Sequence, residues 1–156
     1  ISEDNLIIMD KYESFAGEMA TAAKKVQAAG RKFSFHPLFF DLKPTDGIIP
    51  LDFLLENIPD MKIVLDIYHV IMAGLDPVSI INKYSPYTDI VHFKESKTLN
   101  GKQLLVPVGQ GDTDWKPIIN ACVDTGVKYC FIEQESSEKD IFECMEDSLK
   151  YVTLFL

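Results

Sequence analysis

The sequence predicts an α/β fold in which parallel strands are joined by helices. One helix is followed by four strand–helix pairs, a spacing that is typical of a parallel sheet with crossover helices. The strands are apolar runs rather than alternating patterns, as expected when both faces of a sheet are covered. We expect helices at residues 10–29, 50–58, 76–85, 114–126 and 137–156, and strands at residues 32–36, 62–66, 88–95 and 127–135.

The first elements are bounded by glycine and proline. Residues 10–29 are rich in alanine, with apolar positions at helical spacing, and Gly30 follows as a stop signal. Pro37 closes the short strand that comes next. Pro50 stands in the first turn of the following helix, where its missing amide hydrogen is not needed.

The later elements carry comparable signals. Asp76 is the expected N-cap of one helix, with a proline at the first helical position. Asp114 is the expected cap of the next helix, and Gly126 is its expected stop. Between these two helices and after the strand at residues 88–95, we expect residues 96–113 to form a long polar loop.

The composition is that of one ordinary globular domain, which we expect to span residues 1–156. The chain has 47% hydrophobic and 25% charged residues. Its net charge of −9 and isoelectric point near 4.7 disfavour nucleic acid and anionic membrane surfaces as partners, because both are recognised by basic patches. No run approaches the roughly 18 apolar residues that a membrane span needs.

The cysteines provide no framework for disulfides or zinc. Cys122, Cys130 and Cys144 are odd in number, and their spacing fits neither kind of site. We expect them to be reduced, small residues of the core. Reduced cysteines favour a cytoplasmic location.

Chemically active side chains fall at the ends of the predicted strands. The first strand ends at His36, and the second ends at Asp66 with His69 just beyond. The third presents His92, and the fourth presents Glu133. Ligands bind at the carboxyl ends of strands in parallel α/β folds, so all three histidines are expected on one functional rim.

Each of these residues alone has a simpler interpretation. A histidine at a strand end is often a structural residue, and an acidic residue there often caps a helix. Lys94 and Glu95 are by default a surface ion pair, and Trp115 is most simply a contact of the core or of a lid. Together, however, Asp, His and Glu on three successive strands offer ligands to a divalent cation such as Mn²⁺, Mg²⁺, Co²⁺ or Zn²⁺.

Five segments resemble a known family in their order and spacing. They read FHPLFFDL…DGIIPLDFLLEN, VLDIYHVIMAGLDPVSIINKY, IVHFKES, VPVGQGDTDWKPIINAC and VKYCFIEQE. They are similar to the C-terminal half of the xylose-isomerase-like TIM-barrel superfamily of sugar phosphate isomerases and epimerases. The resemblance implies a (β/α)₈ barrel of which this chain supplies approximately strands 5–8 with their helices.

A complete barrel takes roughly 200–250 residues, whereas this chain has 156 and begins with Ile1 rather than Met. We therefore expect the N-terminal half to be absent from it. A lone half barrel exposes strand edges and an apolar face. The chain is therefore expected to need the missing half, a partner copy in a homo-oligomer, or a rearranged packing. The fragment alone is expected to be inactive.

The resemblance also implies roles for individual residues. Asp66, His92 and Glu133 match three metal ligands, and Glu133 matches an acid/base residue as well. His69 matches a position that contacts substrate. The implied chemistry is proton abstraction beside a carbonyl of a sugar or sugar phosphate, through a metal-stabilised enediolate. Lys94 would supply a positive charge near the metal-bound oxygens, and Trp115 is a further candidate for substrate binding.

One wall of the site departs from the family pattern. Phe35 stands where the epimerase branch has a glutamate, Leu38 replaces a histidine, Asp41 replaces a longer glutamate, and Gln110 replaces a charged glutamate. Three alternatives are open for the fourth ligand: His36 completes the coordination, Asp41 does, or neither residue does.

Two alternatives to the enzyme remain open, and the departures at Phe35, Leu38 and Gln110 favour the first of them. The first is a catalytically silent barrel homologue that acts as a carbohydrate-binding or regulatory module. The second is an independent flavodoxin-like domain, which is disfavoured because no glycine-rich phosphate turn follows the first strand.

Overall fold

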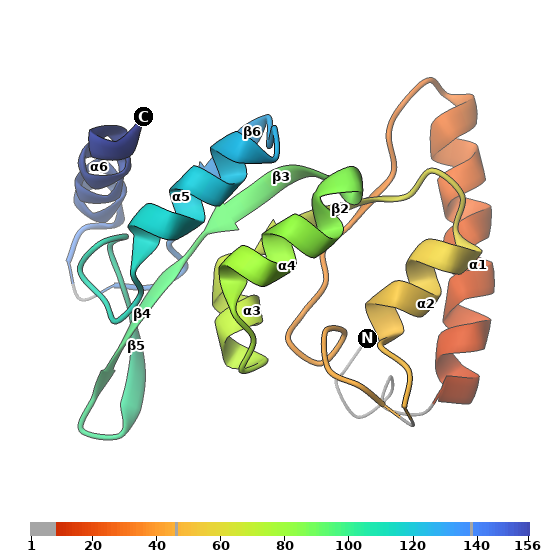
Figure 1. Cartoon of the computed structure of the whole chain (residues 1–156), viewed down its shortest axis with the longest axis horizontal. Coiled ribbons are helices and arrows are strands. Elements are labelled where there is room, and N and C mark those ends of the chain that lie inside the picture. The colour runs from red at the N-terminus through yellow and green to blue at the C-terminus, as the bar shows by residue number, and fades with distance from the viewer. Residues whose placement is uncertain (1–8, 46, 138) are drawn as a thin grey trace.

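The computed structural model describes residues 9–45, 47–137 and 139–156. Its centre is a four-stranded sheet with the order β1-β2-β3-β6, in which every neighbouring pair is parallel (Figure 1). The predicted parallel α/β arrangement is thus confirmed. The strands are β1 (Ser34–Phe35), β2 (Lys62–Asp66), β3 (Thr88–Phe93) and β6 (Tyr129–Ile132).

Every expected helix is present. The helices are α1 (Met9–Ala28), α2 (Pro50–Asn57), α3 (Ile67–Met72), α4 (Pro77–Tyr84), α5 (Trp115–Asp124) and α6 (Ile141–Val152), with short 3₁₀ turns at Ser85–Tyr87 and Thr153–Phe155. The expected start of the last helix was too early, because Asp140 caps α6 by accepting hydrogen bonds from the amides of Phe142 and Glu143. The short helix α3 was not expected.

The expected polar loop at residues 96–113 is wrong over its first half. That part forms an antiparallel hairpin of β4 (Glu95–Leu99) and β5 (Lys102–Val106). The turn between the strands is Asn100-Gly101, in which both residues have positive φ, 52° and 75°. Such Asn-Gly turns match the twist of paired strands, so this dipeptide was the overlooked signal.

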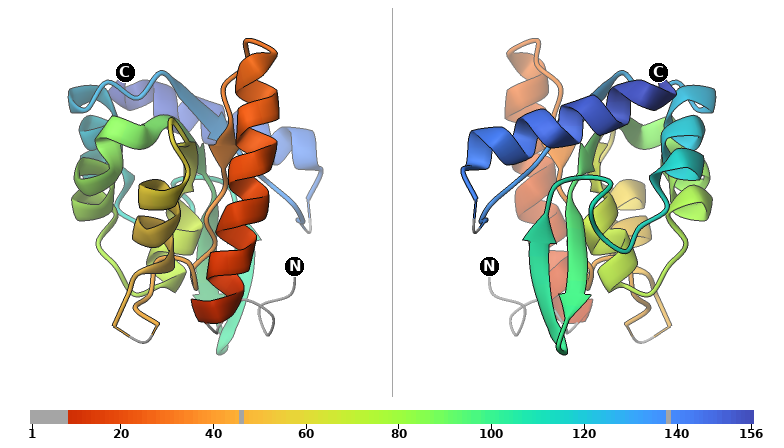
Figure 2. Two further views of the ribbon diagram at one scale, coloured as in Figure 1. Left: turned by 90° about the vertical axis from the view of Figure 1, so that its right-hand side faces the viewer. Right: turned by 90° about the vertical axis from the view of Figure 1, so that its left-hand side faces the viewer.

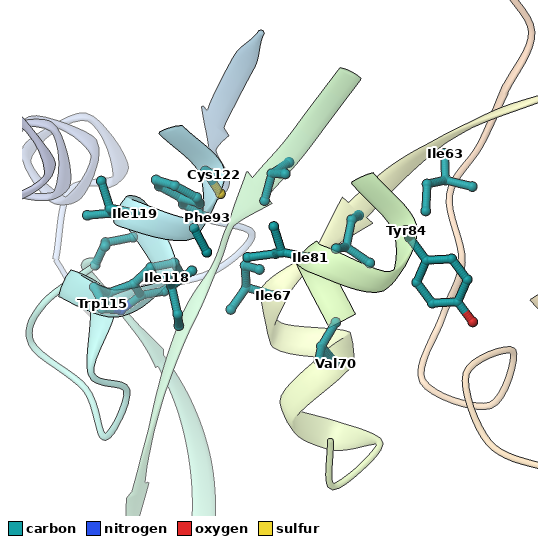
Figure 3. Packing of buried hydrophobic residues seen from close by; sticks show 14 of the residues in the cluster. Ile63, Ile67, Val70, Ile81, Tyr84, Phe93, Trp115, Ile118, Ile119 and Cys122 are labelled. Atoms are coloured by element: carbon teal, nitrogen blue, oxygen red, sulfur yellow. The ribbon is translucent and has the colours of Figure 1, made fainter. Parts of the chain in front are cut away.

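The outer face of the sheet packs against the helices. Ile63, Leu65, Val91 and Phe93 point to this side of β2 and β3 and are at most 1% exposed. Helices α4 and α5 supply the opposing layer (Figure 3). Its buried side chains include Ile81, Tyr84, Trp115, Ile118, Ile119 and Cys122.

Helices α1 and α6 lie at opposite ends of the sheet (Figure 2). At the β1 end, Tyr12, Ala16 and Ala23 of α1 form a second buried cluster with Leu54 and Ile58. At the other end, β6 is an edge strand among the residues that the structure describes.

The expectation that all three cysteines belong to the core is wrong for one of them. Cys122 and Cys144 are buried, whereas Cys130 is exposed. The reason is that Cys130 lies on the edge strand β6. In the described part of the chain, no helix is long and apolar enough to cross a membrane.

Candidate metal centre

Four side chains from the four parallel strands converge at one rim of the sheet. His36, Asp66, His92 and Glu133 each offer a ligand atom, and these atoms all lie within 4.8 Å of one another. Asp66 and His92 are direct partners in the β2–β3 register. Glu133 lies two residues beyond Phe131, the β6 partner of His92, so the pleat turns all three to the same face.

Asp66 has one committed and one uncommitted oxygen. Its Oδ1 accepts a hydrogen bond of 2.8 Å from the amide of Tyr68, which caps α3. Its Oδ2 is buried without a hydrogen-bond partner among the described residues and lies 3.7 Å from Nε2 of His36. Burial raises the pKa of the Asp66 carboxyl to about 6, although the charge of Lys94 opposes this shift.

His92 and Glu133 approach each other closely. Nδ1 of His92 lies 2.6 Å from Oε2 of Glu133, yet this buried nitrogen makes no aligned hydrogen bond within the described chain. Burial tends to raise the pKa of Glu133, but Lys94 and His92 outweigh it, so the pKa of this carboxyl lies below its usual value.

Buried polar atoms without hydrogen-bond partners indicate whether the rim can hold a metal ion. Asp66 Oδ2, His92 Nδ1 and His69 Nδ1 are buried without hydrogen-bond partners among the described side chains. Orphaned polar atoms are rare in proteins and call for a ligand, an ion or water. Two imidazoles and two carboxylates suit Mn²⁺, Co²⁺ or Zn²⁺, and the carboxylates also suit Mg²⁺. The donor set therefore fits a divalent cation.

His69 lies beside these four residues without being one of them. Its ring contacts those of His36 and Tyr68 edge to face, with centroids 5.8 and 5.4 Å away, and stacks on Phe39 at 6.4 Å. Burial, assisted by the charges of His36 and Lys94, lowers the pKa of His69 to about 4. The imidazole is therefore neutral at neutral pH.

The expected surface ion pair between Lys94 and Glu95 is wrong. Both residues are buried, with exposures of 4% and 1%. The Nζ of Lys94 lies 3.3 Å from Glu133 Oε1 and 2.8 Å from Glu135 Oε1. Burial alone would lower the pKa of Lys94, but these carboxylates raise it, so the ammonium stays charged.

Glu95 points away from the rim and serves the neighbouring loop instead. Its carboxylate accepts hydrogen bonds from Nε1 of Trp115, from Oγ1 of Thr113 at 2.8 Å and from the amide of Ser96 at 3.0 Å. A Cβ on Gly111 would clash with the same carboxylate, so only glycine fits there. Trp115 is fully buried against Phe93 and belongs to the larger hydrophobic cluster, in agreement with the core interpretation.

The two candidates for a fourth ligand have different positions. His36 is one of the four converging residues, whereas Asp41 is not. Asp41 is 1% exposed, and its carboxylate accepts hydrogen bonds of 2.7 Å from Oη of Tyr12 and from the amide of Leu38. Asp41 thus holds the turn that follows His36 and ties it to α1.

The sequence reasoning overlooked two residues at the rim. Glu135 pairs with Lys94, and the ring of Tyr68 lies under the Lys94 ammonium at 5.2 Å. The two-residue period of β6 could have indicated Glu135, which follows Glu133 on the same side. Gln110, by contrast, lies away from the rim and bonds Asp147 of α6 at 3.3 Å.

Comparison with known proteins identifies the fold. A family model described as xylose isomerase-like TIM barrel matches residues 2–152 of the chain. The chain belongs to the xylose isomerase-like TIM barrel family. The flavodoxin-like alternative is therefore wrong, in agreement with the sheet order, in which the strands follow one another as they do around a barrel.

The curated relatives that the chain matches are longer than the chain. An inosose dehydratase of Lacticaseibacillus casei is 20% identical over 92% of the chain and 54% of its own length. The chain thus spans about half the length of the curated relatives it matches.

Solved structures show the same relation. A sugar phosphate isomerase/epimerase from Parabacteroides distasonis has a TM-score of 0.73 at 20% identity, over 91% of this chain and 51% of its own. The probable 3-DHS dehydratase of Bacillus anthracis has a TM-score of 0.77 at 17% identity, over 94% and 58%. The four parallel strands are therefore about half of a (β/α)₈ barrel, as the sequence predicted.

Proposed function

We propose that the chain forms the metal-binding and proton-transfer part of a divalent-metal-dependent enzyme of the sugar isomerase, epimerase or dehydratase type. The observation that carries this proposal is the convergence of four ligand atoms at one rim. Three buried polar atoms at this rim have no hydrogen-bond partner among the described residues. Isomerisation, epimerisation and dehydration of hydroxy-carbonyl compounds can all begin with removal of a proton beside the carbonyl. The proposed substrate is accordingly a sugar, a sugar phosphate or a related polyol ketone.

His36, Asp66, His92 and Glu133 would hold the cation. When bound, a divalent cation would polarise the substrate carbonyl and stabilise the negative charge that develops there. Carboxylate and imidazole donors bind metal only in their deprotonated forms, so the low pKa of Glu133 favours this role.

Glu133 is the proposed acid/base residue. It stands at the rim with 29% of its side chain exposed, and its Oε1 faces Lys94. Lys94 is held charged beside it and would stabilise a developing oxyanion. Neutral His69 has a free Nδ1 within the described residues and would orient a substrate hydroxyl by hydrogen bonding.

A second function is favoured by the wall around β1. Phe35 packs into both hydrophobic clusters and has no carboxylate with which to oppose Glu133. A site with one acid/base residue suits a catalytically silent module that binds carbohydrate. This alternative predicts sugar binding that does not depend on the metal.

Calorimetric titration of the chain with a ketose and with a sugar phosphate separates the two functions. For the enzyme-type site, binding measured with Mn²⁺ present should disappear with a chelator. The Glu133→Gln variant should weaken Mn²⁺ binding while its thermal unfolding stays unchanged, and Glu143→Gln, on exposed α6 surface, should alter neither. Sugar binding that persists after chelation would support the silent module instead.

A further inference from the structure

Two of the three cysteines lie on facing elements of the outer layer. Cys122 belongs to α5 and is 3% exposed, whereas Cys130 belongs to the edge strand β6 and is exposed. Both side chains line one largely apolar pocket of about 290 Å³, together with residues from the end of α6. Figure 3 shows the sulfur of Cys122 beside the ribbon of β6.

The two thiols also differ in reactivity. The neighbouring thiol of Cys130 raises the pKa of Cys122, and burial raises it further. The same proximity lowers the pKa of Cys130. The exposed thiol is thus the one that ionises first, and the thiolate is the form of cysteine that reacts.

We propose that Cys122 and Cys130 form a redox-active pair, in which Cys130 is oxidised by a hydroperoxide and Cys122 resolves the product into a disulfide. This proposal concerns the outer layer of the fold and is independent of the metal site. Neither residue belongs to the four that converge at the rim.

The chemistry proceeds in two steps. The Cys130 thiolate attacks hydrogen peroxide, the O–O bond breaks, hydroxide leaves, and Cys130 becomes a sulfenic acid. The sulfur of Cys122 then attacks the sulfur of Cys130, the S–O bond breaks, and the oxygen leaves as water with the proton of the Cys122 thiol. The two thiols lose two electrons in total, and the peroxide is reduced to water.

The third cysteine provides an internal control. Cys144 is fully buried in α6, and its sulfur contacts Oγ of Ser137 at 3.1 Å. It does not line the pocket shared by the other two. The disulfide would join α5 to the outer side of β6, while Glu133 projects from the inner side at the rim.

The test is oxidation of the fully reduced chain with a small excess of hydrogen peroxide. The intact mass should fall by about 2 Da, for the two hydrogens lost, with no dimer on a non-reducing gel. Peptide mapping should find Cys122 linked to Cys130, with Cys144 still open to alkylation after unfolding. Reduction with a dithiol should restore the original mass.

Three variants assign the roles. Cys122→Ser should accumulate a sulfenic acid at Cys130, detectable as a dimedone adduct. In Cys130→Ser, hydrogen peroxide should oxidise the remaining thiols at least about tenfold more slowly than it oxidises those of the unchanged chain, because both remaining cysteines are buried. Cys144→Ser should form the disulfide as the unchanged chain does. Circular dichroism checks that each variant is folded. If a variant does not fold, peptide mapping of the disulfide in the unchanged chain still tests the proposal.

Three results would overturn the proposal. They are a disulfide that includes Cys144, a dimer linked through Cys130, and direct conversion of Cys130 to a sulfinic acid while Cys122 remains a free thiol. Unchanged Mn²⁺ affinity of the oxidised chain is expected, since Cys122 and Cys130 lie outside the set of four ligand residues.

Discussion

The two faces of the parallel sheet differ in what they contain, although the same strands form both. On the outer face, Leu65 and Phe93 are 0% and 1% exposed and pack under the helices. On the inner face, Phe131 is 52% exposed, and the strands end in the converging ligands at the rim. Because side chains alternate along a strand, one residue can pack under the helices while its neighbour in the sequence faces the ligand site.

This division has a physical basis. Apolar burial supplies free energy of folding at about 25 cal/mol per Å², and the larger of the two buried clusters includes the outer face. The inner rim instead collects buried polar atoms without partners, an arrangement that opposes folding until a ligand binds. Substitutions on the two faces should therefore affect different measurements.

The largest effect on stability is expected at the outer face. Phe93→Ala removes a ring that is 1% exposed and packed against Trp115, so the free energy of unfolding should fall by about 3–5 kcal/mol. Phe131→Ala, the matched change on the inner face, should lower it by less than about 1 kcal/mol. Urea denaturation measures both. Equal losses would show that the two faces do not divide these roles.

At the inner rim, Asp66→Asn should weaken Mn²⁺ binding by at least about 100-fold, because it replaces a charged ligand by a neutral one. The free energy of unfolding of the metal-free chain should, in contrast, increase in this variant. The folded pKa of about 6 lies above the ordinary value of 3.8, so the metal-free chain loses stability as pH rises from about 4 to 6. The asparagine variant avoids that loss and should be more stable at pH 8 by about 3 kcal/mol. Calorimetry measures the Mn²⁺ affinity, and urea denaturation at pH 8 measures the stability. An asparagine variant that loses both Mn²⁺ affinity and stability would contradict this account of Asp66.

The same carboxyl sets a pH dependence for metal binding. A proton competes with the cation for Asp66 below about pH 6. Mn²⁺ affinity should therefore be nearly constant between pH 7 and 8 and fall progressively below 6. Titrations at a series of pH values measure this, and an affinity that stays constant down to pH 5 would be inconsistent with Asp66 as a ligand.

The smallest effect on stability and metal affinity is expected at Tyr12 of α1, which contacts the turn after His36 through Asp41. Tyr12→Phe removes the hydrogen bond to Asp41 and should lower the free energy of unfolding by about 1–2 kcal/mol. Asp41 keeps its bond from the amide of Leu38, so Mn²⁺ affinity should stay within about threefold. Tyr87→Phe, at a tyrosine that is 39% exposed, is the control and should change neither quantity. A large loss of affinity in Tyr12→Phe would indicate that Asp41 is a ligand.

Sequence alone predicted much of this arrangement, because strand periodicity and chain order determine it. Asp66, His92 and Glu133 end three successive strands, and parallel strands bring such ends to one edge. The family resemblance added the barrel, which composition and spacing alone did not specify.

Other features depended on contacts between distant parts of the chain. The choice between His36 and Asp41 rests on Tyr12, which precedes Asp41 by 29 residues and whose hydroxyl donates a hydrogen bond to the Asp41 carboxylate. The exposure of Cys130 rests on the position of β6 at the sheet edge. The hairpin of β4 and β5 could have been predicted from the sequence, because Asn100-Gly101 is a strong local turn signal.

Titration of the metal-free chain with Co²⁺, followed by visible absorption, tests the central claim most directly. The spectrum of the bound ion reports both the number of ions and the kind of ligands. We predict one ion per chain, a spectrum of nitrogen and oxygen ligands, and loss of that spectrum in Asp66→Asn and His92→Ala. A folded chain that binds no stoichiometric Co²⁺, or that binds it equally well in both variants, would contradict the assignment of the metal centre to His36, Asp66, His92 and Glu133.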